Sequence, residues 1–582
     1  MMSVPYLLFE FTDGNGRKNP ALFKDPIDII ETSREEEVLD KLRLVETYAA
    51  EGMYAAGYLA YEAAPAFDQA FIVKKGEGPL LWFGIFKSKL LPENDVALKP
   101  FEVSEWKAEM EQDEYQKGFQ YIRQQIEEGN TYQVNFTMRL RAQFSGDDFA
   151  FYKRLSKAQN SNYSAYLNTG RRRILSASPE LFFRQEGGEI TARPMKGTAA
   201  RGKTFLEDRQ KSKWLYESEK NRAENLMIVD LLRNDLGAVA EAGSVRVPEL
   251  FAIEKYPTVW QMTSEIKAGL KKGLGITDVM KALFPCGSIT GAPKISTMGI
   301  IAETEQSARG IYCGAIGYIE PGGNAIFNVP IRTVAIDAES GEAEYGAGGG
   351  ITWDSEMRDE YGEAYIKARL LTQNPQSFEL LESLRLEDGE YVLRELHLKR
   401  IMESAAYFSY PADIEHIGGK LEAYAQSAPD GHFKVRCLLS SAGSVSVEGI
   451  PIGDSPDNVK IKLADGPVSS DNTFLYHKTT NRSVYNDFRA ELKDEYDVLL
   501  WNERGELTEF TQGNLVIKMA GGLYTPAISS GLLAGTLRQS LIDEGRIEER
   551  ILHKSVLKDA DEIWFINSVR GWIKAEMALP LS

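Results

Sequence analysis

The hydrophobic pattern of the chain stops and restarts at the stretch TQNPQS, residues 372–377. Before it, the spacing of apolar residues predicts a long helix over about 355–371. After it, the pattern predicts a strand, an Asp-Gly hairpin, a second strand and a helix. A polar Asn-Pro segment is typical of a linker, and a chain of 582 residues is too long for one hydrophobic core. We therefore predict two domains, residues 1–372 and 373–582.

The composition is ordinary for a soluble globular protein. Hydrophobic residues make up 43% of the chain and charged residues 26%, and the formal net charge of −18 disfavours a polyanionic partner. The sequence shows no apolar run of membrane-spanning length, and its start has neither the basic region nor the cleavage site of a secretory signal. We therefore expect a cytoplasmic enzyme that binds neither nucleic acid nor membrane.

Strand and helix patterns are mixed throughout the first half. The apolar runs YLLFEF, AAGYLAYEA and LLWFGIF predict strands before residue 100. Apolar residues at helical spacing predict a helix from about 113 and a longer one over 214–236. Further strands are predicted over 311–319 and 325–336, because these stretches are rich in β-branched and aromatic residues. The pattern predicts a mixed fold of the α+β or α/β class.

One lysine stands in an unusual setting. Lys196 lies in the segment TARPMKGTAA, two residues after Pro194 and directly before Gly197, with Arg193 and Arg201 close in sequence. Nearby cations disfavour the protonated form of an amine, so Lys196 is a candidate nucleophile that the two arginines help to keep neutral if the fold brings them near. The alternative is a solvated basic turn.

Three glutamates on two predicted helices are candidate metal ligands. Glu224 precedes an apolar run, and Glu360 and Glu363 are three residues apart, so both point from one helix face. Carboxylates from separate helices suit Mg²⁺, which takes the rest of its coordination shell from water and substrate oxygens. The three cysteines are too far apart for a zinc site or a disulfide framework. A solvated helix face is the alternative for each glutamate.

A glycine-rich strand end, YGAGGGITWDS at 345–355, is a candidate ligand-binding segment. Such runs let the backbone approach a ligand and donate N–H groups to a carboxylate or phosphate. The spacing is not that of a dinucleotide-binding fingerprint. A tight bulged turn is the alternative.

Taken together, the motifs of residues 113–371 resemble the chorismate-utilising enzyme family, which includes anthranilate synthase and aminodeoxychorismate synthase component I. The segments that carry the resemblance are, in chain order, GNTYQVNFT, SASPELFFR, RPMKGTAARG, RAENLMIVDLLRNDLG, PCGSITGAPK, IYCGAIGYI, NVPIRTV and GAGGGITWDSEMRDEYGEA. The resemblance implies a chorismate-binding αβ sandwich of two sheets and a Mg²⁺-dependent reaction of chorismate.

The resemblance also implies roles for single residues at positions that match the family's motifs. Lys196 stands where anthranilate synthases usually have alanine, and it resembles the lysine that attacks ring carbon C2 in aminodeoxychorismate synthases. Glu180 resembles the general acid that assists loss of the ring hydroxyl, and Arg332 resembles the cation that pairs with a substrate carboxylate. The other residues implied in this way are Tyr312, Thr290, Gly348, Gly349 and Gly350 as chorismate contacts and Glu224, Glu363 and, in the outer shell, Glu360 for Mg²⁺.

The implied reaction adds ammonia to the ring at C4, para to the ring carboxylate, so the enzyme needs a source of ammonia. The sequence contains no segment of the G-x-C-x-G kind that typifies a glutaminase nucleophile. Cys286 belongs to the motif FPCGSITG, where a small packed residue is the expected role. The resemblance therefore implies a separate glutamine amidotransferase subunit.

The second half contains another candidate catalytic lysine. Lys478 is followed about thirty residues later by Glu509, and Gly535 and Thr536 open a predicted helix. A lysine, an acid for the pyridinium nitrogen and a helix N-terminus for the phosphate are what pyridoxal phosphate (PLP) requires. Each signal alone also fits a plain structural role: a surface lysine, a solvated strand end and a helix cap.

The order of these segments resembles the class IV aminotransferase family, of the type IV PLP fold, over about 376–582. LHLKRIMESA resembles the family's H-x-x-R-L helix, which makes Arg400 an implied phosphate contact. Lys478 is the implied cofactor-bearing lysine and Glu509 the implied partner of the pyridinium nitrogen. The other implied phosphate contacts are Gly535, Thr536, Asn567 and Ser568. The strand SFELLESL lacks the glycine-rich entry of the relatives, which leaves the substrate-side contacts open.

Beside a chorismate-aminating half, the second resemblance implies a lyase that removes pyruvate from the amination product and yields 4-aminobenzoate. Two alternatives stay open. The second half is an aminotransferase for another substrate, or one half is catalytically inactive and serves in assembly. The resemblance also raises a homodimer formed through the PLP half.

Overall fold

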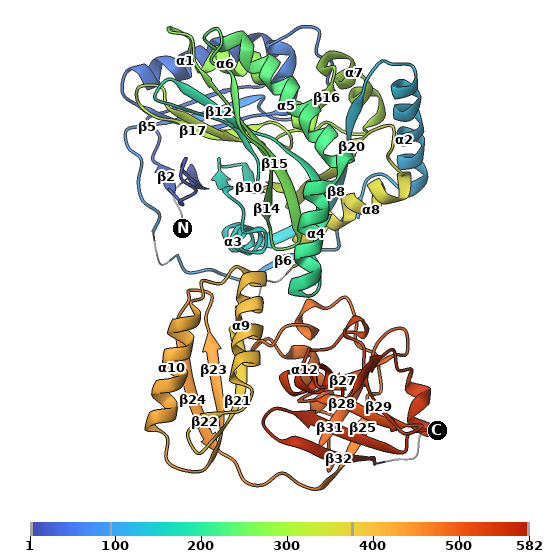
Figure 1. Ribbon diagram of the computed structural model, residues 1–582. Coiled ribbons are helices and arrows are strands. Elements are labelled where there is room, and N and C mark those ends of the chain that lie inside the picture. The colour runs from blue at the N-terminus through green and yellow to red at the C-terminus, as the bar shows by residue number, and fades with distance from the viewer. Residues whose placement is uncertain (1–3, 94–95, 374–376, 579–582) are drawn as a thin grey trace. The chain divides into compact units, whose positions relative to one another are not determined.

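A computed structural model describes residues 4–93, 96–373 and 377–578, and the chain divides into two compact units (Figure 1). The first unit contains residues 1–200 and 212–375, and the second contains residues 201–211 and 376–582. A short segment from the middle of the first half therefore belongs to the second unit. The predicted linker includes residues 374–376, which lie outside the described residues.

Two ten-stranded antiparallel sheets form the centre of the first unit. In hydrogen-bonded order, the first sheet consists of β16 (Gly291–Ala292), β8 (Gln133–Gly146), β20 (Glu342–Ile351), β19 (Thr333–Asp337), β10 (Arg172–Ser178), β9 (Tyr163–Asn168), β1 (Tyr6–Phe11) and β2 (Ala21–Lys24), with β6 (Phe101–Val103) and β7 (Lys107–Ala108) paired to β8. The second consists of β13 (Met195–Ala200), β15 (Val259–Gly269), β12 (Glu189–Arg193), β11 (Leu181–Glu186), β18 (Ala325–Asn328), β17 (Ala315–Ile319), β4 (Tyr54–Leu59), β5 (Leu81–Phe86) and β3 (Asp28–Thr32), with β14 (Arg246–Lys255) paired to β15. The predicted two-sheet sandwich is confirmed, and its antiparallel pairing makes this unit α+β.

Apolar side chains fill the space between the two sheets. In β1, Leu7, Phe9 and Phe11 join one buried cluster with Tyr318 and Ile326 of the other sheet. A strand buried in this way reads as a continuous apolar run, which is how YLLFEF appears in the sequence. Each large side chain fully buried here contributes about 1.5–3 kcal/mol to stability.

Helices cover the outer faces of the sandwich. The helices of this unit are α1 (Val38–Ala50), α2 (Gln112–Glu127), α3 (Asp148–Gln159), α5 (Glu219–Val239), α6 (Ile276–Leu283), α7 (Lys294–Thr304) and α8 (Met357–Ala368). In α2, Tyr115, Phe119 and Ile122 lie at helical spacing and are buried, while Glu111 and Glu114 form a capping box at its start. This confirms the helix predicted from about 113.

Two predicted elements are each interrupted in the structure. The helix expected over 214–236 is two helices, α4 (Phe205–Glu217) and α5, because Ser218 has an extended backbone and its Oγ accepts a hydrogen bond from Asn221 N at 3.4 Å. The strand expected over 325–336 divides into β18 and β19. Between them, Pro330 has no amide donor and Arg332 has a φ of 52°.

The second unit has two sheets of its own. A four-stranded antiparallel sheet consists of β22 (Glu390–Tyr391), β21 (Leu380–Glu387), β23 (His432–Leu439) and β24 (Val445–Pro451), and it packs against α9 (Arg394–Phe408) and α10 (Ile414–Ser427). The predicted Asp-Gly hairpin joins β21 to β22, with positive φ at both Asp388 and Gly389. This turn type requires that backbone.

The larger sheet of the second unit closes on itself. Its strands are β27 (Leu507–Phe510), β26 (Asp497–Trp501), β25 (Asn458–Leu463), β32 (Gly571–Met577), β31 (Glu562–Asn567), β28 (Asn514–Met519), β29 (Gly522–Pro526) and β30 (Glu548–Arg550). Because β27 also pairs with β28, six strands form a closed ring around a buried cluster that includes Phe510, Ile517 and Phe565. The helices α11 (Ser483–Arg489) and α12 (Thr536–Asp543) belong to this part.

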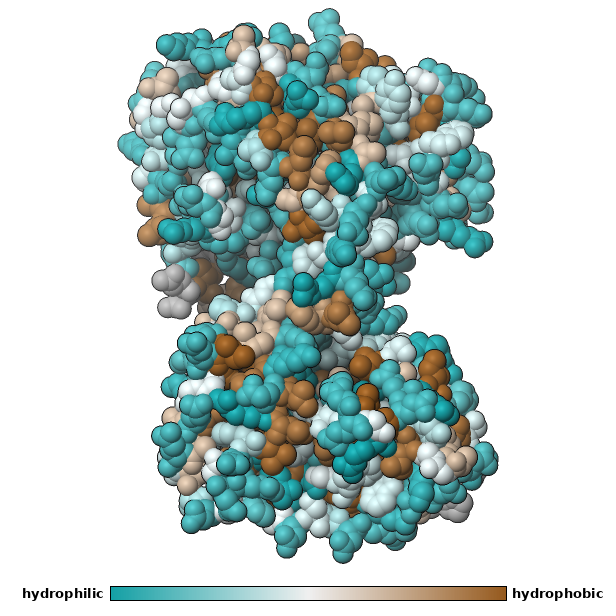
Figure 2. All heavy atoms as spheres, in the orientation of Figure 1, coloured by the Kyte–Doolittle hydropathy of each residue, from teal (hydrophilic) through white to brown (hydrophobic). Residues whose placement is uncertain are grey.

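The visible surface of the molecule is mostly hydrophilic. Figure 2 shows this for one face, with hydrophobic residues of the first unit gathered around α5 and β16. Within residues 4–93, 96–373 and 377–578, no helix is long and apolar enough to cross a membrane.

Candidate active sites

A cavity of about 510 Å³ in the first unit collects nearly all the residues predicted for chorismate and Mg²⁺. Its wall includes Glu180, Lys196, Glu224, Tyr312, Arg332, Gly348, Gly349, Gly350, Glu360 and Glu363. Lys196 comes from β13, Glu224 from α5, the glycines from β20, and Glu360 and Glu363 from α8. Thr290 lies outside this wall. It is fully buried, and its Oγ1 donates to Cys286 O at 3.0 Å.

Lys196 lies at the glycine-rich strand. A Cβ atom on Gly350 would be 2.5 Å from Lys196 Nζ and 2.0 Å from Gln133 Nε2, so only glycine leaves room for both side chains. Burial lowers the pKa of Lys196. The negative charge of Glu224 raises this pKa, and the positive charge of Lys367 lowers it. The buried amine is therefore easier to deprotonate than a surface lysine.

The expectation that Arg193 and Arg201 keep Lys196 neutral is wrong. The Arg193 guanidinium pairs with Glu254 at 2.9 Å and with Glu249 at 3.3 Å. Arg201 belongs to the second unit, where it pairs with Asp208 at 2.6 Å. Burial, Glu224 and Lys367 are instead the largest influences on the pKa of Lys196.

Glu180 is the buried acid of the cavity, with 2% of its surface exposed. Burial raises the pKa of Glu180 to about 7, although Ser288 Oγ donates to its Oε1 at 2.6 Å and Lys196 also favours the anion. A carboxyl group with this pKa carries a proton in a large share of molecules near neutral pH, as a general acid requires. Ser288 was missed in the sequence, although it lies in the quoted motif PCGSITGAPK.

Arg332 presents a buried cation to the same cavity. Burial lowers its pKa, and its Nη1 has no hydrogen-bond partner among the described residues. An unpartnered buried donor of this kind is rare in folded proteins. A guanidinium is well shaped to bind a carboxylate with two hydrogen bonds, so this group fits an anionic substrate.

The three glutamates predicted for Mg²⁺ face this cavity from two helices. Burial raises the pKa of Glu224 and of Glu360, whereas Lys367, whose Nζ lies 2.7 Å from Glu363 Oε1, lowers the pKa of Glu363. Among the described residues, no group of three or more His, Cys, Asp or Glu side chains is compact enough to hold a metal by itself. Carboxylate oxygens are the kind of ligand that a hard cation such as Mg²⁺ takes together with water and substrate oxygens. Lys367 is a second residue that sequence reasoning missed.

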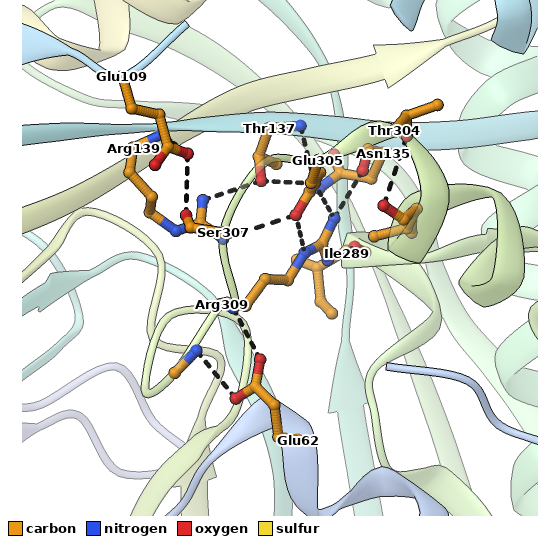
Figure 3. Close-up of polar contacts among 12 residues, drawn as sticks. Glu62, Glu109, Asn135, Thr137, Arg139, Ile289, Thr304, Glu305, Ser307 and Arg309 are labelled. Carbon is orange, nitrogen blue, oxygen red and sulfur yellow. Dashed lines mark hydrogen bonds and ion pairs between the residues drawn. The ribbon is translucent and has the colours of Figure 1, made fainter. Parts of the chain in front are cut away.

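A buried ionic cluster supports one wall of the cavity (Figure 3). Arg309 donates to Glu305 at 2.7 Å and to the carbonyl oxygens of Asn135 and Ile289, both also at 2.7 Å. Asn135 and Ile289 line the cavity. The Arg139 guanidinium lies 4.9 Å from the ring centre of Tyr312. These contacts fix the backbone of two cavity-lining segments.

Lys478 is a half-buried lysine of the second unit. Burial lowers its pKa to about 7, and Arg400 lowers it in the same direction. The Lys478 carbonyl accepts from Leu381 N at 3.0 Å, which ties this segment to β21. This partial burial disfavours the predicted alternative of a fully exposed surface lysine.

Glu509 lies on β27 with both carboxylate oxygens engaged. Tyr485 Oη donates to its Oε1 at 2.8 Å, Leu533 N donates to the same oxygen at 3.1 Å, and Asn514 Nδ2 donates to Oε2 at 3.3 Å. Burial raises the pKa of Glu509 to about 7. The weaker contact leaves Oε2 the better placed oxygen for a pyridinium nitrogen. Tyr485 was not predicted from the sequence.

The predicted phosphate-binding residues lie on two connected segments. Arg400 on α9 makes a two-pronged pair with Glu382, at 2.8 and 2.7 Å, and its Nη1 donates to Ala534 O at 3.0 Å. Gly535 is the N-cap of α12, where a Cβ atom would lie 1.8 Å from Asn514 Oδ1. Thr536 Oγ1 lies 3.1 Å from His397 Nε2. The start of α12 therefore suits a phosphate beside Arg400.

Asn567 and Ser568 lie at the turn between β31 and β32. The Asn567 side chain donates to Gln512 O at 3.1 Å and accepts from Val569 N and Arg570 N at 3.0 and 2.7 Å. These contacts engage its amide within the turn. The phosphate-binding role of both residues stays a prediction.

Comparison with known proteins identifies the class of both halves. Residues 5–373 match the model of chorismate binding enzymes, so the chain belongs to this family. Within the family it is a fused form, because residues 379–576 match the amino-transferase class IV model.

Curated relatives match the first half. The chain is 42% identical over 283 residues to aminodeoxychorismate synthase component 1 of Escherichia coli K12, which covers 48% of this chain and 61% of that relative. It is 38% identical over 297 residues to the protein of the same name from Bacillus subtilis, with 51% and 61% covered. Anthranilate synthase component 1 of Aquifex aeolicus is 37% identical over 277 residues, with 48% and 56% covered. The matches span less than two thirds of each relative.

A solved structure supports the fold of the first half. Anthranilate synthase component I from Streptococcus pneumoniae aligns with a TM-score of 0.52 and 25% identity. The alignment covers 63% of this chain and 90% of that protein.

Proposed function

We propose that the first unit makes 4-amino-4-deoxychorismate from chorismate and ammonia, and that the second unit removes pyruvate from this product to give 4-aminobenzoate, a folate precursor. The observation that carries the proposal is Lys196, a half-buried lysine with a lowered pKa that lines one cavity with Glu180 and Arg332. The similarity to relatives named aminodeoxychorismate synthase component 1 supports it. The proposed setting is the cytoplasm, with ammonia from a separate glutamine amidotransferase subunit.

In the proposed first reaction, Arg332 binds a carboxylate of chorismate, and Glu224 and Glu363 would hold Mg²⁺, with Glu360 as an outer carboxylate. Unprotonated Lys196 attacks ring carbon C2, the double bond shifts, and the C4–O bond breaks. Glu180 donates the proton with which the hydroxyl group leaves as water. Ammonia then adds at C4, the double bond shifts back, and the bond between C2 and Lys196 breaks.

In the second reaction, the phosphate of PLP would be held by Arg400, the start of α12 and the Asn567–Ser568 turn. Glu509 would pair with the ring nitrogen, and Lys478 would bind the reactive carbon. Bound PLP supplies a sink for the electron pair released at the substrate's ring carbon. Lys478 takes the proton from the carbon that carries the amino group. The neighbouring C–O bond breaks, pyruvate leaves, and the ring becomes aromatic.

The test is a product analysis with chorismate, Mg²⁺ and ammonium. The wild type should release 4-aminobenzoate and pyruvate in equal amounts. Lys196→Ala should form neither, whereas Lys478→Ala should accumulate 4-amino-4-deoxychorismate. Lys272→Ala, a change at an exposed lysine of the first unit, is the matched control.

Three results would contradict the proposal. Full activity of Lys196→Ala would show that Lys196 is not the nucleophile. Anthranilate as the main product would show that the amino group is added ortho, rather than para, to the ring carboxylate. Amino-group transfer from an amino donor to a keto acid, faster than pyruvate release, would make the second unit an aminotransferase.

A further inference from the structure

Within the second unit, residues 201–204 lead into the first turns of α4, residues 205–211, and an ion pair closes this segment, which we call the 201–211 loop. Arg201 donates to Asp208 through Nε at 2.6 Å and through Nη2 at 2.7 Å, and Gly202 N donates to Asp208 Oδ1 at 3.0 Å. Only 7% of the Arg201 side chain and 4% of the Asp208 side chain are exposed. A buried pair with this two-pronged geometry defines the loop, because either charge alone would be costly to bury.

The loop contacts the C-terminal end of α9 at Tyr407. Arg201 Nη2 donates to Tyr407 O at 2.9 Å, and its guanidinium lies 4.4 Å from the centre of the Tyr407 ring. In return, Tyr407 Oη donates to Gly202 O at 2.8 Å. The same helix carries Arg400, the candidate phosphate ligand.

The loop also contacts the residue next to Lys478. His477 Nε2 lies 3.1 Å from Lys203 O, and its Nδ1 lies 3.0 Å from Ser404 Oγ on α9. Burial lowers the pKa of His477 to about 4, so the ring is neutral. A carbonyl oxygen only accepts, so Nε2 carries the proton and Nδ1 accepts from Ser404. His477 thereby links the loop, α9 and the Lys478 segment.

We propose that residues 201–211 are a positioning element of the cofactor site in the second unit, although they come from within the first half of the sequence. The loop holds Arg400 and Lys478 at their relative positions through Tyr407 and His477. Arg201 and Asp208 are positioning residues, since neither is placed to touch the cofactor or the reacting atoms. This inference rests on the proposed function, because it takes PLP as the ligand of Lys478.

The test measures PLP binding by the full-length protein. Apo-protein is titrated with PLP, and the dissociation constant and the pH midpoint of the visible band of lysine-bound PLP are recorded. The variants are Arg201→Met, which removes the buried cation, and Tyr407→Phe, which removes one hydroxyl group. Lys203→Ala is the matched control, because it removes only the exposed ion pair with Asp471 and keeps the carbonyl that His477 uses.

Arg201→Met should weaken PLP binding by about tenfold or more and shift the pH midpoint, because it removes several charge-assisted contacts. Tyr407→Phe should weaken binding by a few-fold, and Lys203→Ala should match the wild type. Arg201→Lys, which keeps the charge without the two-pronged geometry, should fall between Arg201→Met and the wild type. If Arg201→Met fails to fold, the dissociation constant of Tyr407→Phe for PLP still tests the inference.

Wild-type dissociation constants and midpoints in both Arg201→Met and Tyr407→Phe would overturn this inference. A loss of binding in Lys203→Ala as large as in Arg201→Met would also overturn it, since the effect would then not depend on the buried contacts. Absence of the proposed PLP site has a different signature. In that case the wild type itself would form no visible band that Lys478→Ala abolishes. An aminotransferase in place of the lyase would be recognised by the product analysis above.

Discussion

At the scale of single residues, Glu180 and Lys196 have opposite protonation requirements in one cavity. The acid must carry a proton and the nucleophile must not, and burial moves both pKa values toward neutrality, that of Glu180 to about 7. Near neutral pH, a share of the molecules therefore carries a protonated Glu180 together with an unprotonated Lys196.

The pH dependence of the first reaction should therefore be bell-shaped. The rate should rise as Lys196 loses its proton, and the loss of the Glu180 proton, with a pKa of about 7, should oppose this rise. Glu180→Gln keeps the shape of the side chain but cannot donate a proton, so it should lower the rate by about 10²–10⁴-fold and abolish the falling limb. Rates of chorismate consumption between pH 5 and pH 10, roughly the range in which such groups titrate, check this. A falling limb that persists in Glu180→Gln would assign it to another group.

Lys367 should set the rising limb of the same profile. Its cation lowers the pKa of Lys196, so Lys367→Met should raise that pKa and move the rising limb to higher pH. Lys272→Met, at an exposed lysine, should leave the limb in place. An unchanged profile in Lys367→Met would mean that burial alone adjusts Lys196.

The sequence motifs pointed to the proposed reactive residues but not to the residues that tune their pKa values. Lys196 and Glu180 were found through motifs, and the structure brings them into one cavity. The cation beside Lys196 was sought in Arg193 and Arg201, yet it is Lys367 on α8, a helix from a distant part of the sequence. Sequence neighbours on strands and turns point in different directions, so their proximity to a side chain depends on the fold.

At the scale of elements, the path of β20 depends on glycine where it passes Lys196. Gly350→Ala should abolish the first reaction, because the new Cβ atom would lie 2.0 Å from Gln133 Nε2 and 2.5 Å from Lys196 Nζ. Gly237→Ala on α5, where no atom lies within 4 Å of the added Cβ, should keep activity and stabilise the fold by about 0.5–1 kcal/mol. Initial rates and thermal unfolding of both variants test this. Normal turnover by Gly350→Ala would show that the strand can move aside.

Element predictions succeeded where the local sequence decides the backbone. The hairpin at Asp388 and Gly389 was predicted because few other residue pairs adopt positive φ at both positions. The break at Ser218 was missed because the apolar pattern of the flanking helices continues across it, although serine is a favoured N-cap. The closed ring of strands in the second unit depends on pairings between distant segments, such as β25 with β32, which no local pattern specifies.

At the scale of the whole molecule, the two proposed reactions differ in their need for a metal. Exhaustive EDTA treatment should stop chorismate consumption, because Glu224 and Glu363 then lack the Mg²⁺ that they share with the substrate. Pyruvate release from supplied 4-amino-4-deoxychorismate should continue, because the groups assigned to that reaction belong to the second unit. Added Mg²⁺ should restore the first reaction. Equal inhibition of both reactions by EDTA would contradict this division.

Because the second unit is discontinuous in sequence, its parts are translated at different times. Residues 201–211 leave the ribosome roughly 165 residues before the rest of their unit, a delay of about 8–33 s at ~5–20 residues per second. The Arg201–Asp208 pair spans seven positions and can close the loop during that interval, whereas Tyr407 and His477 have not yet been translated. The nascent chain thus carries a closed segment of the second unit while the first unit is still being translated. The second unit is completed only after synthesis passes His477.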